Sequence, residues 1–276
     1  MVGASLLELL TVPHAKWLMS LDERAALEGI LVSTKPSLAV EIGTARGGSL
    51  ERISMHSALV HSFDLARDPE LTDERFPNVT FHTGDQHELL PVVLDDLASA
   101  GATIDFVLVD GDHAARGIRR DLEDLLASPC TKRTVILIHD AINERVRAGL
   151  EEVAWKNFES IRFLDLDFLM GRMFRGGSLS EALWGGFGLV ITGDGPPERP
   201  IMRLDCYEGP DVYDAFVAAR GRGDASGRPA YREFKMLEDW LADLQSSLEQ
   251  ILGSRSWRLT APLRRADQVV QRVLRR

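Results

Sequence analysis

The chain has 276 residues, of which 45% are hydrophobic and 27% are charged. These values are typical of a globular protein with a full core, and they exclude a mainly disordered chain. No apolar run approaches the roughly 20 residues of a membrane-spanning helix, and two cysteines are too few for a disulfide framework or a four-thiolate metal site. The net charge of −10 argues against a general nucleic-acid binder. Because no basic region precedes the first apolar stretch, no signal peptide is expected, and we predict a cytoplasmic protein.

Short apolar runs alternate with amphipathic stretches through the middle of the chain. The runs that we expect to be strands are 38–42, 59–64, 79–82, 104–109, 134–139 and 187–192. The helical patterns between them are 48–57, 88–100, 114–127 and 144–158. Each strand run is apolar enough to be buried on both faces, as in a parallel sheet. We therefore predict an α/β fold, a Rossmann-like doubly wound and mostly parallel sheet with helices on both faces.

The composition divides the chain into three parts. Residues 1–35 are expected to form an N-terminal helical cap, and residues 36–224 the α/β domain. Residues 225–276 are expected to contain a linker, a short heptad helix and a basic tail. Within the domain, residues 165–186 are rich in Gly, Met and Phe. We expect this stretch to form a loop or a short helix near the mouth of the substrate site.

A glycine turn joins the first predicted strand to the first predicted helix of the domain, in the segment AVEIGTARGGSLERI. Gly43 allows a tight turn, and Gly47 and Gly48 let the backbone approach a ligand closely. The spacing E-x-G-x-x-x-G differs from the G-x-G-x-x-G of dinucleotide binders, so a pyrophosphate is not the expected ligand. Glu41 before the turn favours a cationic or amine-bearing ligand instead.

Acidic residues also follow the second and third predicted strands. Asp64 stands 21 residues after Gly43, near the spacing at which an acid holds a ribose diol. Asp85 follows the third strand, where a carboxylate can accept a hydrogen bond from an exocyclic amine such as that of adenine. Together with Glu41, these acids predict a pocket for a nucleoside without phosphates. A Rossmann-like domain with another nucleotide is the alternative.

On these motifs, residues 36–193 resemble the class I S-adenosylmethionine-dependent methyltransferases. The segment EIGTARGGS is similar to their first motif, Asp64 to their ribose acid, and Gly84-Asp85 to their adenine-contacting pair. The resemblance implies a Rossmann-like fold and S-adenosylmethionine as co-substrate. The residues that it assigns to the co-substrate are Glu41, Gly43, Thr44, Gly47, Ser49, Asp64, Gly84, Asp85 and Asp110.

Charged side chains also follow the fourth and fifth predicted strands. Asp110, Asp112 and His113 follow the fourth strand, and His139 and Asp140 end the fifth. Because the carboxyl ends of neighbouring parallel strands meet at one crevice, these groups should converge. Asp110 and Asp140 are ligands that Mg²⁺ prefers. His139 is either a third ligand, which would favour a softer metal, or a packed residue at the end of its strand. Asp112 is more simply explained as a cap of the following helix, and a solvated loop is the alternative for His113.

The turn V-D-G-D-H and the pair after the fifth strand are similar to those of metal-dependent sugar and natural-product O-methyltransferases, the macrocin O-methyltransferase and cephalosporin-hydroxylase-like group. The resemblance implies that Asp110 and Asp140 are metal ligands and that His113 is the general base. His139 stands where these relatives often have an acid. A cation stabilises an alkoxide, and an imidazole takes its proton, so a sugar hydroxyl can attack the sulfonium methyl.

The C-terminal part has a charge and a periodicity of its own. From residue 254 onward there are seven arginines and one acid, which leaves a charge of −16 on the rest of the chain. Leucine and isoleucine at 237, 241, 244, 248 and 251 form a short heptad seam, which predicts self-association as a homo-oligomer. Residues 253–266 resemble a short segment of bacterial cell-surface glycan enzymes. That resemblance implies docking to partners or anionic lipid, and a solvated basic helix is the alternative.

These observations favour an O-methyltransferase that acts on a sugar hydroxyl of a glycan, glycolipid or glycosylated metabolite, with Mg²⁺ and His113. The expected partner is a sugar-containing acceptor, with no nucleic acid and no membrane span. A methyltransferase of a non-sugar natural product is the second interpretation. A non-catalytic S-adenosylmethionine-binding scaffold in cell-surface glycan assembly is the third. An NAD-dependent dehydrogenase is disfavoured because the dinucleotide motif is missing.

Overall fold

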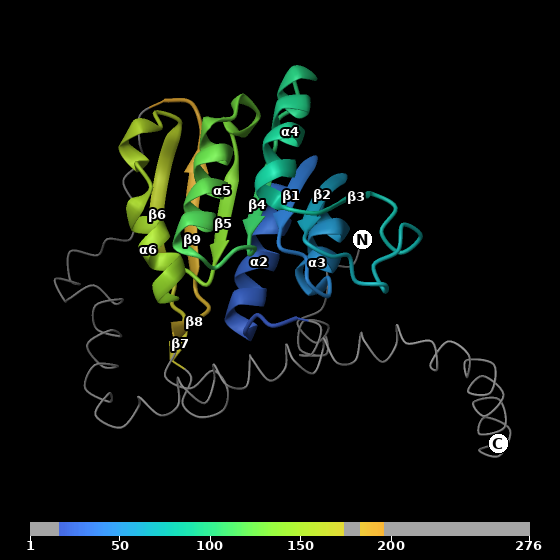
Figure 1. Ribbon diagram of the computed structural model, residues 1–276, viewed down its shortest axis with the longest axis horizontal. Helices are drawn as coiled ribbons and strands as arrows, with labels where there is room; N and C mark the ends of the chain where they lie inside the picture. Colours follow the sequence, from blue (N-terminus) through green and yellow to red (C-terminus); the bar gives the residue numbers. More distant parts are fainter. Residues whose placement is uncertain (1–16, 174–182, 196–276) are drawn as a thin grey trace, which may run out of the picture. The chain divides into compact units, whose positions relative to one another are not determined.

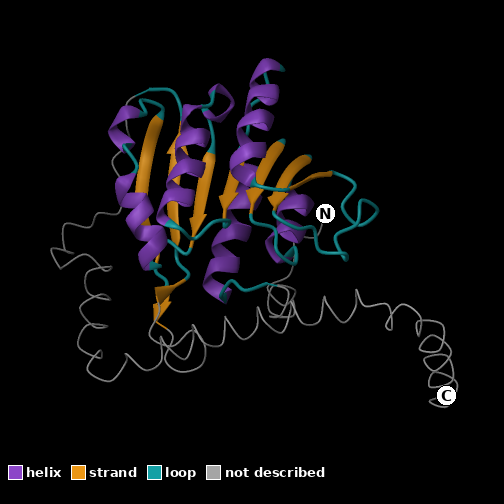
Figure 2. Ribbon diagram, viewed as in Figure 1, coloured by secondary structure: helices purple, strands orange, loops and turns teal. Residues whose placement is uncertain are grey.

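A computed structural model describes residues 17–173 and 183–195. The described residues form a seven-stranded sheet with helices packed on it (Figures 1 and 2). The strands of this sheet are β1 Leu38–Ile42, β2 Leu59–Asp64, β3 Val79–Thr83, β4 Phe106–Val109, β5 Val135–His139, β6 Ile161–Leu169 and β9 Phe187–Thr192. The helices are α2 Leu21–Thr34, α3 Gly48–His56, α4 Gln86–Ser99, α5 Ala115–Ala127 and α6 Glu144–Glu152, with short 3-10 turns η1 Pro129–Thr131 and η2 Trp155–Asn157.

The strand order is β3-β2-β1-β4-β5-β9-β6. The five strands from β3 to β5 are parallel, and β9 runs antiparallel to both β5 and β6. Because the order reverses between β1 and β4, this is a doubly wound sheet with a crevice outside the carboxyl ends of its central strands. The predicted Rossmann-like α/β fold is confirmed.

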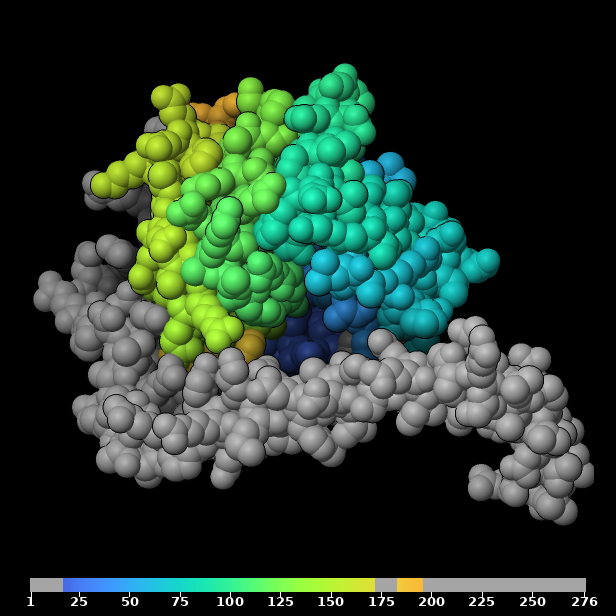
Figure 3. All heavy atoms as spheres, in the orientation of Figure 1, coloured from blue at the N-terminus to red at the C-terminus, as the bar shows by residue number. Residues whose placement is uncertain are grey.

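Two apolar layers cover the faces of the sheet. One layer packs side chains of β1 such as Val40 and Ile42 against α4, α5 and α6. The other packs Ala39 of the same strand against Leu27 of α2 and Leu50 of α3. Successive residues of β1 belong to opposite layers because side chains along a strand point alternately to the two faces of the sheet. In the space-filling view of Figure 3, the helices α4, α5 and α6 cover the face of the sheet that is turned to the viewer.

The six strand predictions are confirmed, with ends that differ by two residues at most. The prediction of a loop or short helix over 165–186 is wrong for residues 165–169, because they belong to the nine-residue strand β6. Asp165 and Asp167 interrupt its apolar pattern, and every position of β6 has intermediate burial except Phe168, which is exposed. Residues 172–173 and 183–184 form a second small sheet, β7 Arg172–Met173 with β8 Leu183–Trp184.

The helix predicted over 144–158 ends at Glu152 instead. In the part of the chain that the structure describes, no helix has the length and apolar character needed to cross a membrane. Predictions for residues 1–16, for the heptad seam and for the tail 253–266 lie outside the described residues. Docking through the tail and self-association stay predictions.

Candidate cofactor and catalytic site

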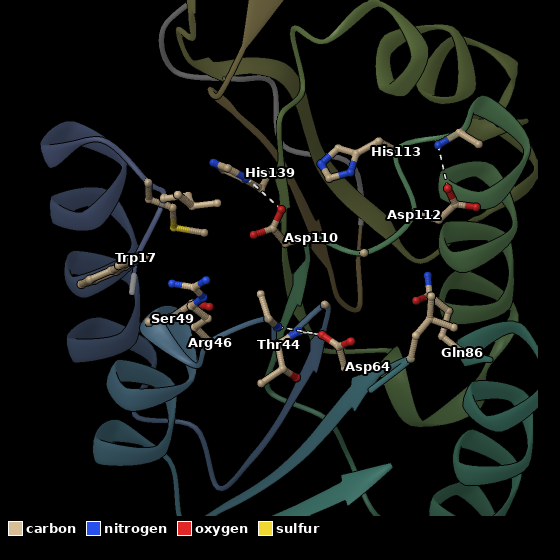
Figure 4. A pocket seen from close by; sticks show the side chains of 18 of the residues that line it. Trp17, Thr44, Arg46, Ser49, Asp64, Gln86, Asp110, Asp112, His113 and His139 are labelled. Carbon is tan, nitrogen blue, oxygen red and sulfur yellow. Dashed lines mark hydrogen bonds and ion pairs between the residues drawn. The ribbon is translucent and has the colours of Figure 1, made fainter. Parts of the chain in front are cut away.

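A cavity of about 1050 Å³ opens at the carboxyl ends of β1, β2, β4 and β5. It brings together residues that lie far apart in the sequence, and Figure 4 draws 18 of them. The sequence-predicted residues that line it are Gly43, Thr44, Gly48, Ser49, Asp64, Asp85, Asp110, Asp112, His113 and His139. The other predicted residues, Glu41, Gly47, Gly84 and Asp140, lie outside its lining.

The glycine turn after β1 forms one wall of this cavity. Gly43 has a φ of +89°, a conformation that favours glycine. A Cβ on Gly43 would overlap the backbone oxygen of Asp110, so the turn packs directly against the loop after β4. Gly47 has a φ of +76° and caps α3 at its N-terminus, where backbone N–H groups are free for a ligand.

Glu41 lies behind this turn and is fully buried. Its carboxyl group accepts hydrogen bonds from Ser49 Oγ at 2.6 Å and from Ser62 Oγ at 3.2 Å. Burial raises the pKa of Glu41 to about 8, against the opposing effect of these two hydroxyls. The group is therefore largely neutral at pH 7, so it organises the turn from behind and does not offer a negative charge to a ligand.

The proton on Glu41 predicts a specific pH dependence of stability. An unfolded chain loses this proton above a pH of about 4.5, whereas the folded protein keeps it up to about 8. Stability should therefore fall as pH rises between these values, by about 1.4 kcal/mol per pH unit from this group. We expect the free energy of unfolding to fall by about 2–3 kcal/mol more in the wild type than in Glu41→Gln between pH 5.5 and 7.5. Denaturant titrations at the two pH values measure this difference, and parallel behaviour of the two proteins would contradict it.

The two acids predicted at the ends of β2 and β3 both line the cavity, and each also fixes local backbone. Asp64 Oδ2 accepts hydrogen bonds from the N–H groups of Thr44 at 2.9 Å and Ala45 at 2.7 Å. The carboxylate thus ties β2 to the glycine turn. Asp85 caps α4 and accepts from His87 N at 2.9 Å. Their assignment to ribose and adenine stays a prediction.

Two imidazoles and two carboxylates meet at the ends of β4 and β5. His139 Nδ1 lies 2.9 Å from Asp110 Oδ1, and His113 Nε2 lies 2.8 Å from Asp140 Oδ2 (Figure 4 shows the first pair). Asp140 has a φ of +54°, which is uncommon for a residue with a side chain. Its Oδ1 accepts the N–H of Gly185. This backbone turn directs the carboxylate of Asp140 toward His113.

The carboxylates change the basicity of both imidazoles. Burial disfavours the charged form of His139, but Asp110 and Asp140 outweigh it and raise the pKa of His139 well above its usual value. The hydrogen bond with Asp140 raises the pKa of His113 as well. His113 lies at the cavity wall with its ring edge-on to Trp184, at a centroid distance of 5.7 Å. It is the more accessible of the two imidazoles and has the arrangement of a base oriented by a carboxylate.

Asp110, His139 and Asp140 form a cluster in which each residue offers one ligand atom within 4.8 Å of the others. Two carboxylate oxygens and an imidazole nitrogen form a donor set that divalent cations accept. The three residues predicted as metal ligands are therefore close enough to share one ion. In the structure, Asp110 Oδ1 and His139 Nδ1 are hydrogen-bonded to each other, and an ion at this place would replace that bond.

Asp112 is not the N-cap residue of α5, contrary to the prediction, because that position is occupied by Ala114, which has no side-chain cap. Asp112 Oδ1 instead accepts the N–H of Ala114 at 2.8 Å and so shapes the turn directly before the helix. A Cβ on Gly117 would overlap the side chain of Asp112, so this first turn of α5 is built around it. Asp112 also lines the cavity and lies 3.6 Å from His87 Nε2.

Sequence reasoning missed several residues of the cavity wall. These are Trp17, Leu18, Met19, Arg46, Leu65, Gln86, His87 and Arg145. Gln86 and His87 follow Asp85 directly, so the rule that strand ends meet at the crevice could have found them. Trp17, Leu18 and Met19 precede α2 and belong to no motif, so nothing local in the sequence places them at the site.

Residues 40–141 match the family model described as a methyltransferase domain. This segment contains the glycine turn, Asp64, Asp85, Asp110, His113 and His139. No curated protein matches the chain significantly.

Solved structures of methyltransferases are also similar to part of this chain. One is the O-methyltransferase from Bacillus cereus in complex with SAH, at 16% identity and a TM-score of 0.48, over 70% of this chain and 93% of that one. A second is the O-methyltransferase TomG from Streptomyces achromogenes, which is involved in tomaymycin synthesis and is in complex with SAM. It has 15% identity and a TM-score of 0.47, over 70% of this chain and 93% of that one. A third is the N-methyltransferase NodS from Bradyrhizobium japonicum in complex with SAH, at 14% identity and a TM-score of 0.42, over 68% of this chain and 96% of that one.

Proposed function

We propose that the protein is an S-adenosylmethionine-dependent methyltransferase that transfers a methyl group to the hydroxyl oxygen of a sugar-containing acceptor. One observation carries the proposal: a single cavity is lined both by the glycine turn with Asp64 and by Asp110 with His113. A co-substrate pocket and a candidate base therefore share the same space. The family match over residues 40–141 supports the class of reaction.

The residues present fit the co-substrate. The turn at Gly43 and the N-terminus of α3 offer backbone groups, and Asp64 and Asp85 offer carboxylates at the cavity wall. S-adenosylmethionine carries no phosphate, which suits this wall, because Asp64 and Asp85 would repel a phosphate group. A cavity of about 1050 Å³ is at the upper end of the volume of small-molecule sites, so it has room for an acceptor beside a nucleoside.

His113 is the residue that we propose as general base. Its Nε2 is hydrogen-bonded to Asp140, so Nδ1 is the nitrogen left to accept a proton. In the proposed reaction the acceptor oxygen bonds to the sulfonium methyl carbon, and the carbon–sulfur bond breaks with its electron pair going to sulfur. The hydroxyl proton goes to His113 Nδ1. Asp140 orients the imidazole and stabilises the charge that it gains.

We propose further that Asp110, His139 and Asp140 hold a divalent cation, with Mg²⁺ as the first candidate. The donor set fits, because the three ligand atoms lie within 4.8 Å of one another. When bound, the ion would supply Lewis-acid stabilisation of an alkoxide. The single imidazole favours testing Mn²⁺ beside Mg²⁺.

Calorimetry tests the co-substrate and the metal separately. We expect saturable heat with S-adenosylmethionine and none with NAD. A further Mg²⁺-linked or Mn²⁺-linked heat should disappear in Asp140→Asn and persist in Asp165→Asn, a control in β6 outside the cavity lining. Absence of S-adenosylmethionine binding would contradict the proposed function. Equal metal heats in the two variants would contradict the metal site only.

Mass spectrometry of acceptor reactions then tests the substrate class. We expect methylated product with glycans, glycolipids or glycosylated metabolites, in the context of cell-surface polysaccharide synthesis. Product only with non-sugar phenols or macrocycles would establish the second interpretation. Binding of S-adenosylmethionine without turnover on any hydroxyl would favour a non-catalytic scaffold.

A further inference from the structure

The N-terminal helix α2 reaches the catalytic cluster through one side chain. Glu23 is the third residue of α2 and is buried. Its Oε1 lies 3.5 Å from His139 Nε2 and accepts the N–H of Gly186 at 2.6 Å. The other oxygen accepts the N–H of Ser20 at 2.5 Å. A single carboxylate thus connects α2, the end of β5 and the turn before β9.

His139 consequently faces a carboxylate at both ends of its ring. Asp110 lies at Nδ1, at 2.9 Å, and Glu23 lies at Nε2, at 3.5 Å. An imidazole with one hydrogen-bonded nitrogen can still pivot about that bond, whereas a second carboxylate at the opposite nitrogen restricts the pivot. The ring of Phe187 lies tilted against His139, at a centroid distance of 5.4 Å.

Two consecutive glycines hold Asp140 and Glu23, two of the carboxylates around this imidazole. Gly185 and Gly186 have φ values of +76° and +75°, so their N–H groups point in directions that ordinary residues rarely allow. The N–H of Gly185 binds Asp140, and that of Gly186 binds Glu23. A Cβ on Gly185 would overlap Oε1 of Glu23, so the absence of a side chain there makes room for the carboxylate.

We propose that Glu23 is a positioning residue, through which helix α2 and the turn at Gly185-Gly186 fix the orientation of His139 beside Asp110 and Asp140. Glu23 is not among the residues that line the cavity, so it acts through His139 and does not touch substrate. An effect of Glu23 on turnover rests on the proposed function, whereas its effect on the orientation of the His139 ring does not. Capping alone does not explain the arrangement, because the capping box needs Ser20 and not His139.

The first test replaces Glu23 by glutamine, which a capping box also accepts at this position. We expect turnover to fall at least tenfold, with the Kd for S-adenosylmethionine and the KM for acceptor changed less than threefold. The imidazole Cε1–H resonance of His139, assigned from His139→Gln, should shift in the two-dimensional NMR spectrum. The resonance reports the orientation of the ring and needs no activity.

Glu28 provides a matched control on the same helix. It is also a largely buried glutamate, and it pairs with Arg52 at 2.7 Å and with His56 at 2.8 Å. Glu28→Gln should therefore lower stability by breaking ion pairs, while turnover and the His139 resonance stay as in the wild type. A shift of His139 in both variants would show a general loosening of α2 and would overturn the proposal.

A second variant moves the carboxylate without removing it. Gly185→Ala would place a Cβ against Glu23 Oε1, and we expect it to reproduce the His139 shift. Gly101→Ala is the control for strain, because Gly101 has a φ of +70° with nothing within 4 Å of the added Cβ. An unchanged His139 resonance and unchanged turnover in folded Glu23→Gln would overturn the proposal. If the wild type binds no S-adenosylmethionine, the proposed function fails, and the His139 resonance still decides the role of Glu23.

Discussion

Replacement of His113 by glutamine is expected to lower turnover by a factor of about 10²–10⁴, the range that general bases contribute. Glutamine can still donate a hydrogen bond to Asp140, but it has no nitrogen that takes a proton at neutral pH. Binding of S-adenosylmethionine should change little, because His113 is expected to contact the acceptor side of the cavity. Single-turnover measurements with saturating co-substrate give the methyl-transfer step directly.

His61→Gln is the control for this experiment. His61 also pairs with a neighbour, since its Nδ1 lies 2.9 Å from His82 Nε2, but it is in β2 and outside the cavity lining. Its turnover should equal that of the wild type. Turnover within threefold of the wild type in His113→Gln would remove His113 from the role of base, whatever the effect on binding.

Much of this site could be predicted because it lies at strand ends. A buried apolar run followed by an acid or a histidine is visible in one sequence, and the parallel sheet then brings such positions to one edge. Asp64, Asp85, Asp110, His113 and His139 all line the cavity for this reason. The pairing of Asp140 with His113 was not predictable, because it depends on the φ of +54° at Asp140.

Other features depend on contacts between distant parts of the chain. Glu41 has the right spacing for a ligand group, but as a residue of β1 it is buried on every side and lies behind the turn. Glu23 carries no motif beyond its capping box, and its contacts with His139 and Gly186 exist only once α2 packs on the sheet. The strand β6 was not predicted because Asp165 and Asp167 interrupt its apolar run. Asp167 is accommodated by an ion pair with Arg147 of α6, a contact between distant parts of the chain.

Gly43→Ala is expected to lower the affinity for S-adenosylmethionine at least a hundredfold, or about 2.7 kcal/mol. Two physical effects add at this position. A side chain at a φ of +89° costs about 1–3 kcal/mol of backbone strain. The added Cβ also overlaps the backbone oxygen of Asp110, so the turn and the loop after β4 have to separate. Any shift of the turn would also disturb the hydrogen bond from the N–H of Thr44 to Asp64, which ties β2 to the turn.

Gly101→Ala is the control for the loss of stability that strain causes. Gly101 follows α4 with a φ of +70°, and an added Cβ meets nothing within 4 Å, so its alanine variant carries the strain alone. We expect both variants to lose stability in denaturant titrations, and only Gly43→Ala to lose co-substrate affinity in calorimetry. Since Gly101 lies outside the cavity lining, a loss of affinity confined to Gly43→Ala shows that the co-substrate depends on the turn after β1 and not on overall stability. Unchanged affinity in a folded Gly43→Ala protein would mean that this turn does not form the co-substrate site.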